Sequence, residues 1–208
     1  MDLSHHREEY AQGTIDTESV AECPYRQFET WFQQANETKL LEPNAMTLAT
    51  VDEQGRPTQR NVLLKYYDRA GFVFFTNYGS RKASQIAENP HVSLLFSWLP
   101  LQRQVEINGR ADKISSVEAL KYFALRPRGS QLAAWVSNQS TVVSTKTVLK
   151  NKLAEFESRF ARGAVPMPPH WGGFRVTPTR FEFWQGGLNR LHDRIEYLTQ
   201  QEQNGWLR

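Results

Sequence analysis

A short segment in the middle of the chain combines the groups that bind phosphate. Residues 79–82, Gly-Ser-Arg-Lys, supply a hydroxyl, two positive side chains and the backbone N–H groups of an expected helix start. A helix N-terminus attracts anions, whereas cations placed there oppose the helix dipole. A bound phosphate dianion would remove this conflict. The alternative interpretation is a helix start that is simply solvated, and the four residues alone do not decide between the two.

A second segment near the C-terminus concentrates positive charge on a few residues. If residues 190–198 form a strand, its two-residue period puts Arg190, His192 and Arg194 on one face. These groups repel one another unless an anion or carboxylate lies among them. The alternative is an exposed edge strand that is protected by charge. The preceding segment 181–187 is an aromatic strand ending in two glycines, which favours the close approach of a flat ligand.

Two further pairs of residues are suited to anions. Arg60 and Lys65 flank an apolar strand on opposite faces, so they either serve two anions or one of them only extends to water. Tyr122 and Arg126 are four residues apart on an expected helix, and Ser130 opens the next element. They are suited to gripping a phosphate, although a cation near a helix C-terminus also has a purely structural explanation. The residues alone therefore predict anionic, phosphorylated, planar ligands on a β-barrel.

The elements that must position these residues follow from periodicity and turn signals. A helix opens at Pro24 and carries the apolar stripe Phe28, Trp31, Phe32 and Ala35. Strands are expected at 45–51, 58–67, 72–77, 91–98, 102–109 (extending toward 114), 174–176, 180–185 and 190–198, and helices at 80–88, 115–125, 129–137 and 145–162. Short strands in runs, with helices inserted between the runs, predict an α+β fold built on an antiparallel barrel with peripheral helices. We expect one domain over residues 1–208, with residues 1–20 as an N-terminal arm.

Composition excludes several classes of protein. The 208 residues are 39% hydrophobic, but no run approaches the roughly 20 apolar residues of a membrane span, and the polar start is not a secretory signal. A single cysteine, Cys23, rules out an internal disulfide and indicates a reducing, cytoplasmic location. The five histidines lack metal-ligand spacing, so no metal is expected. The net charge of +3 and pI of about 9.0 suit small anionic ligands, but the cations lie in separate short motifs rather than the stripe that nucleic acid requires.

The sequence resembles the pyridoxamine 5'-phosphate oxidase family. Residues 181–194, Phe-Glu-Phe-Trp-Gln-Gly-Gly-Leu-Asn-Arg-Leu-His-Asp-Arg, fit the family signature throughout. Supporting motifs lie at 59–65, 75–82, 103–105, 122–130 and 135–140, so the similarity covers nearly the whole chain, from about Arg7 to Trp206. Two departures stand out: Glu8 replaces an often basic residue, and the chain stops at Arg208 without the usual Arg-Leu-x-Pro ending, so a shortened last strand is expected.

The resemblance implies a split β-barrel homodimer with one FMN per active site, each site lined by both subunits. FMN would be held by Arg60, Asn61, Val62, Leu63, Leu64, Lys65, Phe75, Thr76, Arg81, Lys82 and Gln104, and from across the interface by Gln139, Ser140, Trp184 and Arg194. The substrate phosphate would be held by Lys65, Tyr122, Arg126 and Ser130, with Arg7 and Tyr10 in a segment that closes over the substrate. Arg190 and His192 would act at the carbon being oxidised and also bind substrate.

The implied activity is the oxidation of pyridoxamine 5'-phosphate and pyridoxine 5'-phosphate to pyridoxal 5'-phosphate. Dioxygen would be the final electron acceptor and hydrogen peroxide a product, with ammonia released from the amine substrate. One alternative is another split-barrel flavoprotein, which has no reason to keep Tyr122, Arg126 and Ser130. A second alternative is a non-catalytic carrier or sensor of pyridoxal phosphate or FMN, which would bind its ligand without making peroxide.

Overall fold

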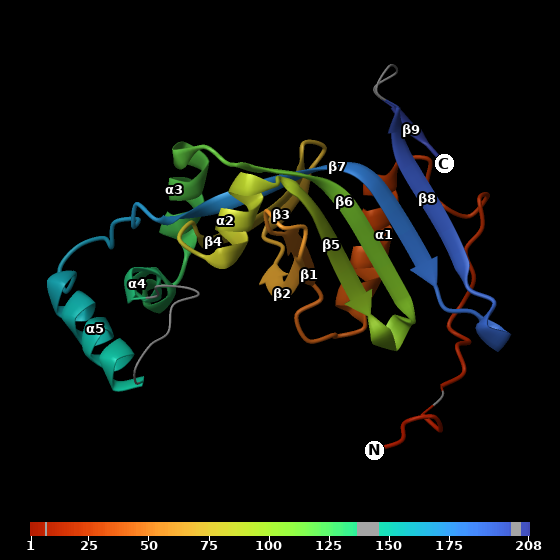
Figure 1. Ribbon diagram of the computed structural model, residues 1–208, viewed down its shortest axis with the longest axis horizontal. Coiled ribbons are helices and arrows are strands. Elements are labelled where there is room, and N and C mark those ends of the chain that lie inside the picture. The colour runs from red at the N-terminus through yellow and green to blue at the C-terminus, as the bar shows by residue number, and fades with distance from the viewer. Residues whose placement is uncertain (7, 137–145, 201–204) are drawn as a thin grey trace.

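A computed structural model describes residues 1–208 except for residue 7, residues 137–145 and residues 201–204 (Figure 1). The helices are α1 (Pro24–Glu37), α2 (Arg81–Glu88), α3 (Ser116–Leu125), α4 (Arg128–Val136) and α5 (Lys146–Arg159), with short 3-10 turns η1 (Leu99–Leu101) and η2 (Leu188–Arg190). The strands are β1 (Ala45–Val51), β2 (Pro57–Leu63), β3 (Tyr66–Asp68), β4 (Gly71–Asn77), β5 (His91–Trp98), β6 (Arg103–Lys113), β7 (Trp171–Gln185), β8 (Asp193–Gln200) and β9 (Gly205–Leu207).

All of these strands belong to one curled antiparallel sheet. Its order is β2-β1-β5-β6-β7-β4-β3, with β8 paired to β7 and β9 to β8. The 15-residue strand β7 organises the sheet, because its first half pairs with β4 and its second half with β8, while β6 runs along its other edge. The β6–β7 register shifts at Asn108/Gly109, where a Cβ on Gly109 would lie 2.3 Å from the carbonyl oxygen of Thr177. Glycine is therefore required at this bend.

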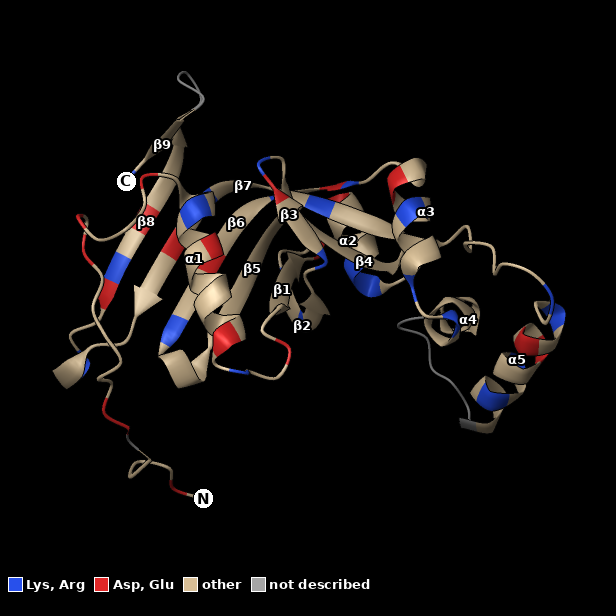
Figure 2. Ribbon diagram, turned by 180° about the vertical axis from the view of Figure 1, so that it is seen from behind, with Lys and Arg blue, Asp and Glu red and all other residues tan. Residues whose placement is uncertain are grey.

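The main core lies between α1 and the sheet. Three members of the stripe predicted from sequence, Phe28, Trp31 and Ala35, are 0–3% exposed, and the fourth, Phe32, is partly buried against them. The Phe28 ring lies 5.0 Å from the ring of Phe72 and 5.0 Å from that of Phe96, both in edge-to-face geometry. Burial of such aromatic side chains is the dominant favourable term in a core of this kind. Helix α1 covers one face of the sheet, as seen from behind in Figure 2.

The remaining elements lie at two opposite ends of the sheet (Figure 1). Helices α3, α4 and α5 extend from one end, where a smaller apolar cluster contains the buried side chains of Phe123, Leu132 and Trp171. Strands β8 and β9 and the N-terminal segment occupy the other end. Among the described residues, no helix is long and apolar enough to cross a membrane.

Three expectations about strands are wrong in detail. Residues 58–67 do not form one strand: β2 ends at Leu63, and the chain bends through residues 64–65, whose backbone N–H groups donate to Asn44 and Val73. Residues 171–185 form one strand rather than two. The expected strand 190–198 starts only at Asp193, because Asn189 and Arg190 have φ values of 54° and 64°, which no strand accommodates. The single-face arrangement predicted for Arg190, His192 and Arg194 is therefore wrong.

Candidate active site

A cavity of about 360 Å³ lies beside the start of α2. It is lined by Thr58, Gln59, Arg60, Arg81 and Lys82. Three of these five residues are cations and none is acidic. Arg81 and Lys82 of the predicted phosphate-binding segment 79–82 thus share a cavity with Arg60 from strand β2, whereas Gly79 and the buried Ser80 are not part of its lining. Lysine, arginine and acidic side chains are otherwise interspersed over the described chain (Figure 2), so the excess of cations here is local.

The Arg60 side chain is fixed by a buried polar network. Its Nη1 donates to Thr50 Oγ1 (2.6 Å) and to the Leu48 carbonyl (3.2 Å), and its Nη2 donates to Thr58 Oγ1. The Gln85 side-chain oxygen accepts from both threonine hydroxyls. This network sets the direction of the guanidinium before any ligand arrives, which reduces the entropy lost on binding.

Two positive side chains of this cavity, those of Arg60 and Lys82, have lowered pKa values, which an anion bound among them would raise again. Burial, with a smaller contribution from Arg81, lowers the pKa of Arg60 below its ordinary value. Burial, and then the charge of Arg60, likewise lowers the pKa of Lys82. Both shifts mean that the positive forms are disfavoured as they stand. A phosphate dianion among these cations would reverse that penalty.

An adjoining cavity of about 260 Å³ shares Lys82 with the first. Several other residues predicted to bind FMN or the substrate phosphate line this cavity. Its lining is Asn61, Val62, Leu63, Lys65, Phe75, Thr76, Lys82, Tyr122, Arg126 and Trp171. The bend after β2 explains why Lys65 reaches this cavity, whereas Arg60 lines the first one. Arg60 and Lys65 thus line different cavities, as two anions would require, while the Lys65 side chain also remains exposed to water.

One wall of the second cavity is a stack of three aromatic rings. The rings of Phe75 and Tyr122 are 4.1 Å apart at 18°, and those of Phe75 and Trp171 are 5.0 Å apart at 10°. The Arg126 guanidinium lies 4.8 Å from the Trp171 ring centroid, a cation–π geometry. Trp171 was missed in the sequence analysis. The only signal for it was a tryptophan directly before two glycines, which does not distinguish a site from a core position.

The Arg126 guanidinium in this cavity has a buried nitrogen atom, Nη1, that makes no hydrogen bond with any residue that the structure describes. Burial lowers the pKa of Arg126 and raises that of Tyr122. An unpaired buried guanidinium nitrogen is costly, so an anionic acceptor in this cavity would be strongly favoured.

A second group of predicted residues lies at the other end of β7. The His192 ring is 4.8 Å from that of Trp184 and 5.6 Å from that of Tyr10, and the Arg190 guanidinium is 5.6 Å from the Tyr10 ring. His192 Nδ1 accepts a hydrogen bond from the Gly187 backbone N–H (3.1 Å), so the neutral ring carries its proton on Nε2. Tyr10 lies against Gly186, where an added Cβ would come within 2.9 Å of its ring. In this structure the Tyr10 ring lies beside Gly186, where the sequence predicts the approach of a flat ligand.

The two groups are far apart within one chain. Trp171 starts β7 and Trp184 lies near its end, which at the usual rise separates them by about 40 Å. The strand register places Gln104 and Arg194 on either side of Trp184, so they belong to the second group. Leu64 is buried and lines neither cavity, and Ser130 lies in the first turn of α4 outside both linings. The predicted residues Arg7, Gln139 and Ser140 lie outside the described residues.

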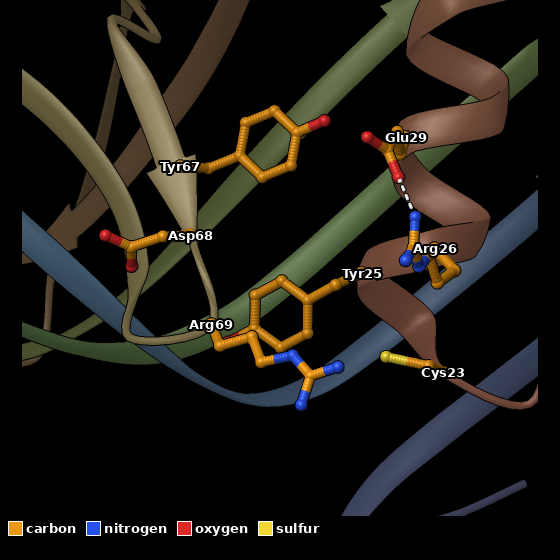
Figure 3. A pocket seen from close by; sticks show the side chains of 7 residues that line it. All are labelled: Cys23, Tyr25, Arg26, Glu29, Tyr67, Asp68 and Arg69. Carbon is orange, nitrogen blue, oxygen red and sulfur yellow. Dashed lines mark hydrogen bonds and ion pairs between the residues drawn. The ribbon is translucent and has the colours of Figure 1, made fainter.

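A third cavity, of about 230 Å³, lies between α1 and the β3–β4 turn (Figure 3). It is lined by Cys23, Tyr25, Arg26, Glu29, Tyr67, Asp68 and Arg69, none of which is a predicted site residue. Arg26 and Glu29 form an ion pair with each other at 3.0 Å. Among the described residues, no group of three histidine, cysteine, aspartate or glutamate side chains could hold a metal ion.

Comparisons with known proteins decide the family. The family described as pyridoxamine 5'-phosphate oxidase matches residues 32–160, and the pyridoxine 5'-phosphate oxidase C-terminal dimerisation region matches residues 171–208. The chain belongs to the pyridoxamine 5'-phosphate oxidase family. It is 57% identical to a pyridoxine/pyridoxamine 5'-phosphate oxidase of Crocosphaera subtropica, covering 99% of this chain and 97% of the relative. It is 51% identical to the enzyme of the same description from Escherichia fergusonii, covering 98% and 93%.

Solved structures agree with this family assignment. PhzG from Burkholderia lata, crystallised with tetrahydrophenazine-1-carboxylic acid, superposes with a TM-score of 0.85 at 28% identity, covering 94% of this chain and 97% of that one. A pyridoxamine 5'-phosphate oxidase-related, FMN-binding protein from Nostoc punctiforme has the same fold, with a TM-score of 0.71 at 16% identity over 90% of this chain and 97% of that one. The family and the split-barrel fold predicted from sequence are therefore confirmed.

Proposed function

We propose that this protein oxidises pyridoxamine 5'-phosphate and pyridoxine 5'-phosphate to pyridoxal 5'-phosphate with the help of FMN. The observation that carries the proposal is the pair of adjoining cation-lined cavities that share Lys82, one of them with an aromatic wall. Two cavities of this kind suit two phosphorylated ring compounds held against each other. The relatives of 51–57% identity named as these oxidases support the same reaction.

The residues of the first cavity fit the phosphate of FMN. Arg60, Arg81 and Lys82 would hold the dianion, and its charge would compensate the burial, and to a smaller extent the mutual repulsion, that lower the pKa of Arg60 and Lys82. The remaining contacts would come from residues 61–65, Phe75 and Thr76 beside it. When bound, FMN would supply the acceptor for the hydride equivalent that leaves the substrate and would pass the electrons to dioxygen.

The residues of the second cavity fit the phosphate of the substrate. Lys65, Tyr122 and Arg126 converge there, with the buried Nη1 atom of Arg126 lacking a partner among the described residues. Ser130, in the first turn of α4, would join them as the family resemblance implies, although it is not part of the cavity lining. A bidentate guanidinium matches phosphate oxygens well, so Arg126 would contribute the strongest single contact.

Arg190 and His192 would orient the amine or alcohol of the substrate, and the positive charge of Arg190 would assist the departure of its proton. Because the Gly187 N–H occupies Nδ1 of His192, the protonated Nε2 side of the ring is the one available to the substrate, to which it would donate a hydrogen bond. These residues lie about 40 Å along β7 from the two cavities, so one chain does not assemble the whole site. A second copy would bring Trp184, Arg190, His192 and Arg194 to the first copy's cavities, with the dimerisation region of residues 171–208 forming part of the contact.

The proposed reaction has a direct test. The purified protein should be yellow from bound FMN, or become so on reconstitution, and should convert pyridoxamine 5'-phosphate and dioxygen to the aldehyde, ammonia and hydrogen peroxide. Flavin binding without turnover of either B6 phosphate would favour a flavoprotein with another substrate. Binding of pyridoxal phosphate without peroxide would favour a carrier. The use of dioxygen and a cytoplasmic location are likewise predictions of this proposal.

Lys82→Ala is expected to weaken FMN binding about 10-fold to 100-fold, because a charge-assisted hydrogen bond contributes about 1.5–3 kcal/mol. The wild-type affinity should also fall at alkaline pH, and at a lower pH than an ordinary lysine would give, because burial and the charge of Arg60 lower the pKa of Lys82. The alanine variant should have a flatter alkaline profile. Flavin fluorescence quenching across pH measures both effects.

The matched control is Lys150→Ala, which removes an exposed lysine from α5. It should leave FMN affinity and its pH profile as in the wild type. Equal FMN affinity for the Lys82 variant and the wild type after dialysis would contradict the assignment of Lys82.

A further inference from the structure

Glu118 on α3 is the centre of a hydrogen-bonded group that joins three elements. Its Oε1 accepts from the Tyr66 hydroxyl of β3 (2.5 Å) and from Arg175 Nη2 of β7 (2.8 Å). Arg175 Nη1 donates in turn to Asp68 Oδ1 (2.6 Å) at the end of β3. The four side chains are thus linked through one carboxylate and one guanidinium. Neither Glu118 nor Arg175 lines either of the two cavities beside α2 and α3.

Each of the three joined elements carries part of the predicted substrate-phosphate cavity. Lys65 immediately precedes Tyr66. On α3, Tyr122 lies one helical turn after Glu118, and Arg126 follows directly after the last residue of the helix. On β7, Trp171, which stacks on Arg126, lies four residues before Arg175. One cluster outside the cavity therefore connects the segments that supply its cations and its aromatic wall.

We infer that Glu118 is a positioning residue that sets the spacing of Lys65, Tyr122 and Arg126 around the substrate phosphate, an inference that rests on the proposed function. Cations that converge on one anion repel one another before it binds, so something else must hold their elements together. The apolar contacts of Phe123, which is 1% exposed, bury the helix but are not directional. The hydrogen bonds of Glu118 are directional and fix α3 against β3 and β7.

The protonation of Tyr66 and the partial burial of Arg175, the two residues that Glu118 contacts, support this role. Burial, together with the hydrogen bond to Glu118, raises the pKa of Tyr66 well above its ordinary value, so its hydroxyl remains a donor throughout the neutral range. Arg175 is held between two carboxylates, and its side chain is 21% exposed, against 32% for Glu118. Isolated exposed ion pairs contribute little, whereas a network of this kind contributes more. The expected effect is accordingly moderate.

The test is Glu118→Gln, which keeps the size of the side chain but removes its charge. We expect the KM for pyridoxamine 5'-phosphate to rise about tenfold, with little change in kcat or FMN affinity, because network ion pairs contribute more than isolated surface pairs. Inorganic phosphate, used as a competitive inhibitor and as a titrant of the apoprotein, should lose affinity by a similar factor. Tyr66→Phe should shift both values in the same direction, and the double variant should show less than the sum of the two effects.

Glu155→Gln, at an exposed position of α5, is the matched control and should behave as the wild type. If the wild-type enzyme is active and the Glu118 variant has the same KM and the same phosphate affinity, the inference is refuted and the proposed function stands. A parallel loss of kcat, FMN affinity and melting temperature would also refute it, since it would indicate general destabilisation. An inactive wild-type protein would refute the proposed function instead, and the phosphate titration would still report on Glu118.

Discussion

Replacing Arg190 with alanine is expected to lower kcat about 10²-fold to 10⁴-fold, the usual contribution of a group that assists proton transfer. FMN affinity should hardly change. The reason is the role proposed for it: in the proposed dimer the exposed Arg190 side chain, which contacts the Tyr10 ring of its own chain, would face the reacting carbon of the substrate, whereas the FMN phosphate would be held by the cations of the cavity beside α2. Stopped-flow reduction of the bound flavin by pyridoxamine 5'-phosphate measures the first quantity, and flavin fluorescence measures the second.

Arg69→Ala is the control for this experiment, because Arg69 is an exposed arginine that lines the cavity of Figure 3 and no part of the predicted site. It should keep wild-type rates. A similar loss of turnover and of flavin binding in the Arg190 variant would show that Arg190 acts on the cofactor rather than on the substrate.

Mixing Arg190→Ala with Lys82→Ala protein tests whether the active site is shared between two copies of the chain. If each site takes Arg190 from one copy and Lys82 from the other, the mixed dimer should recover one intact site.

Replacing Arg126 with alanine is expected to raise the KM for pyridoxamine 5'-phosphate about 10²-fold, since bonds from a buried cation to phosphate are among the strongest in proteins. The Nη1 atom of Arg126 is buried and has no hydrogen-bond partner among the residues that the structure describes, so an added acceptor is expected to bind there strongly. Unphosphorylated pyridoxamine lacks that acceptor, so its much poorer kcat/KM should be nearly the same in the variant and the wild type. Steady-state peroxide production with both substrates provides the comparison.

Arg126 also stacks on Trp171, so the alanine variant removes packing as well as charge. Arg126→Gln keeps a planar group over the ring and is the second variant for that reason. A large effect in both variants, with unchanged melting temperature, is the expected result. If pyridoxamine and its phosphate lost activity equally, the phosphate contact would be excluded as the function of Arg126.

Individual elements show how far sequence reasoning reaches. The helix at Pro24, the strand 45–51 and the strand 91–98 were predicted with their observed bounds or nearly so, because a proline start and alternating burial are local properties. The prediction of a strand at 190–198 was wrong at its start because Asn189 and Arg190 adopt positive φ values. The pattern of residue types in this segment does not indicate such a conformation. The break after Leu63 was missed because the backbone N–H groups of Leu64 and Lys65 donate to the carbonyls of Asn44, 20 residues before Leu64, and of Val73 on the neighbouring strand β4, contacts that the segment itself does not reveal.

The sequence by itself determined the family, the split-barrel class and the candidate groups for binding phosphate, since these depend on residue types at fixed local spacing. Only the tertiary structure decided which of them meet. It placed Lys65 and Arg60 in adjoining cavities, added Trp171 as the surface on which Arg126 stacks, and put Arg190 and His192 at the opposite end of β7. Strand pairing and helix packing join residues that are far apart along the chain, and the spacing of residues within a motif carries no record of those contacts.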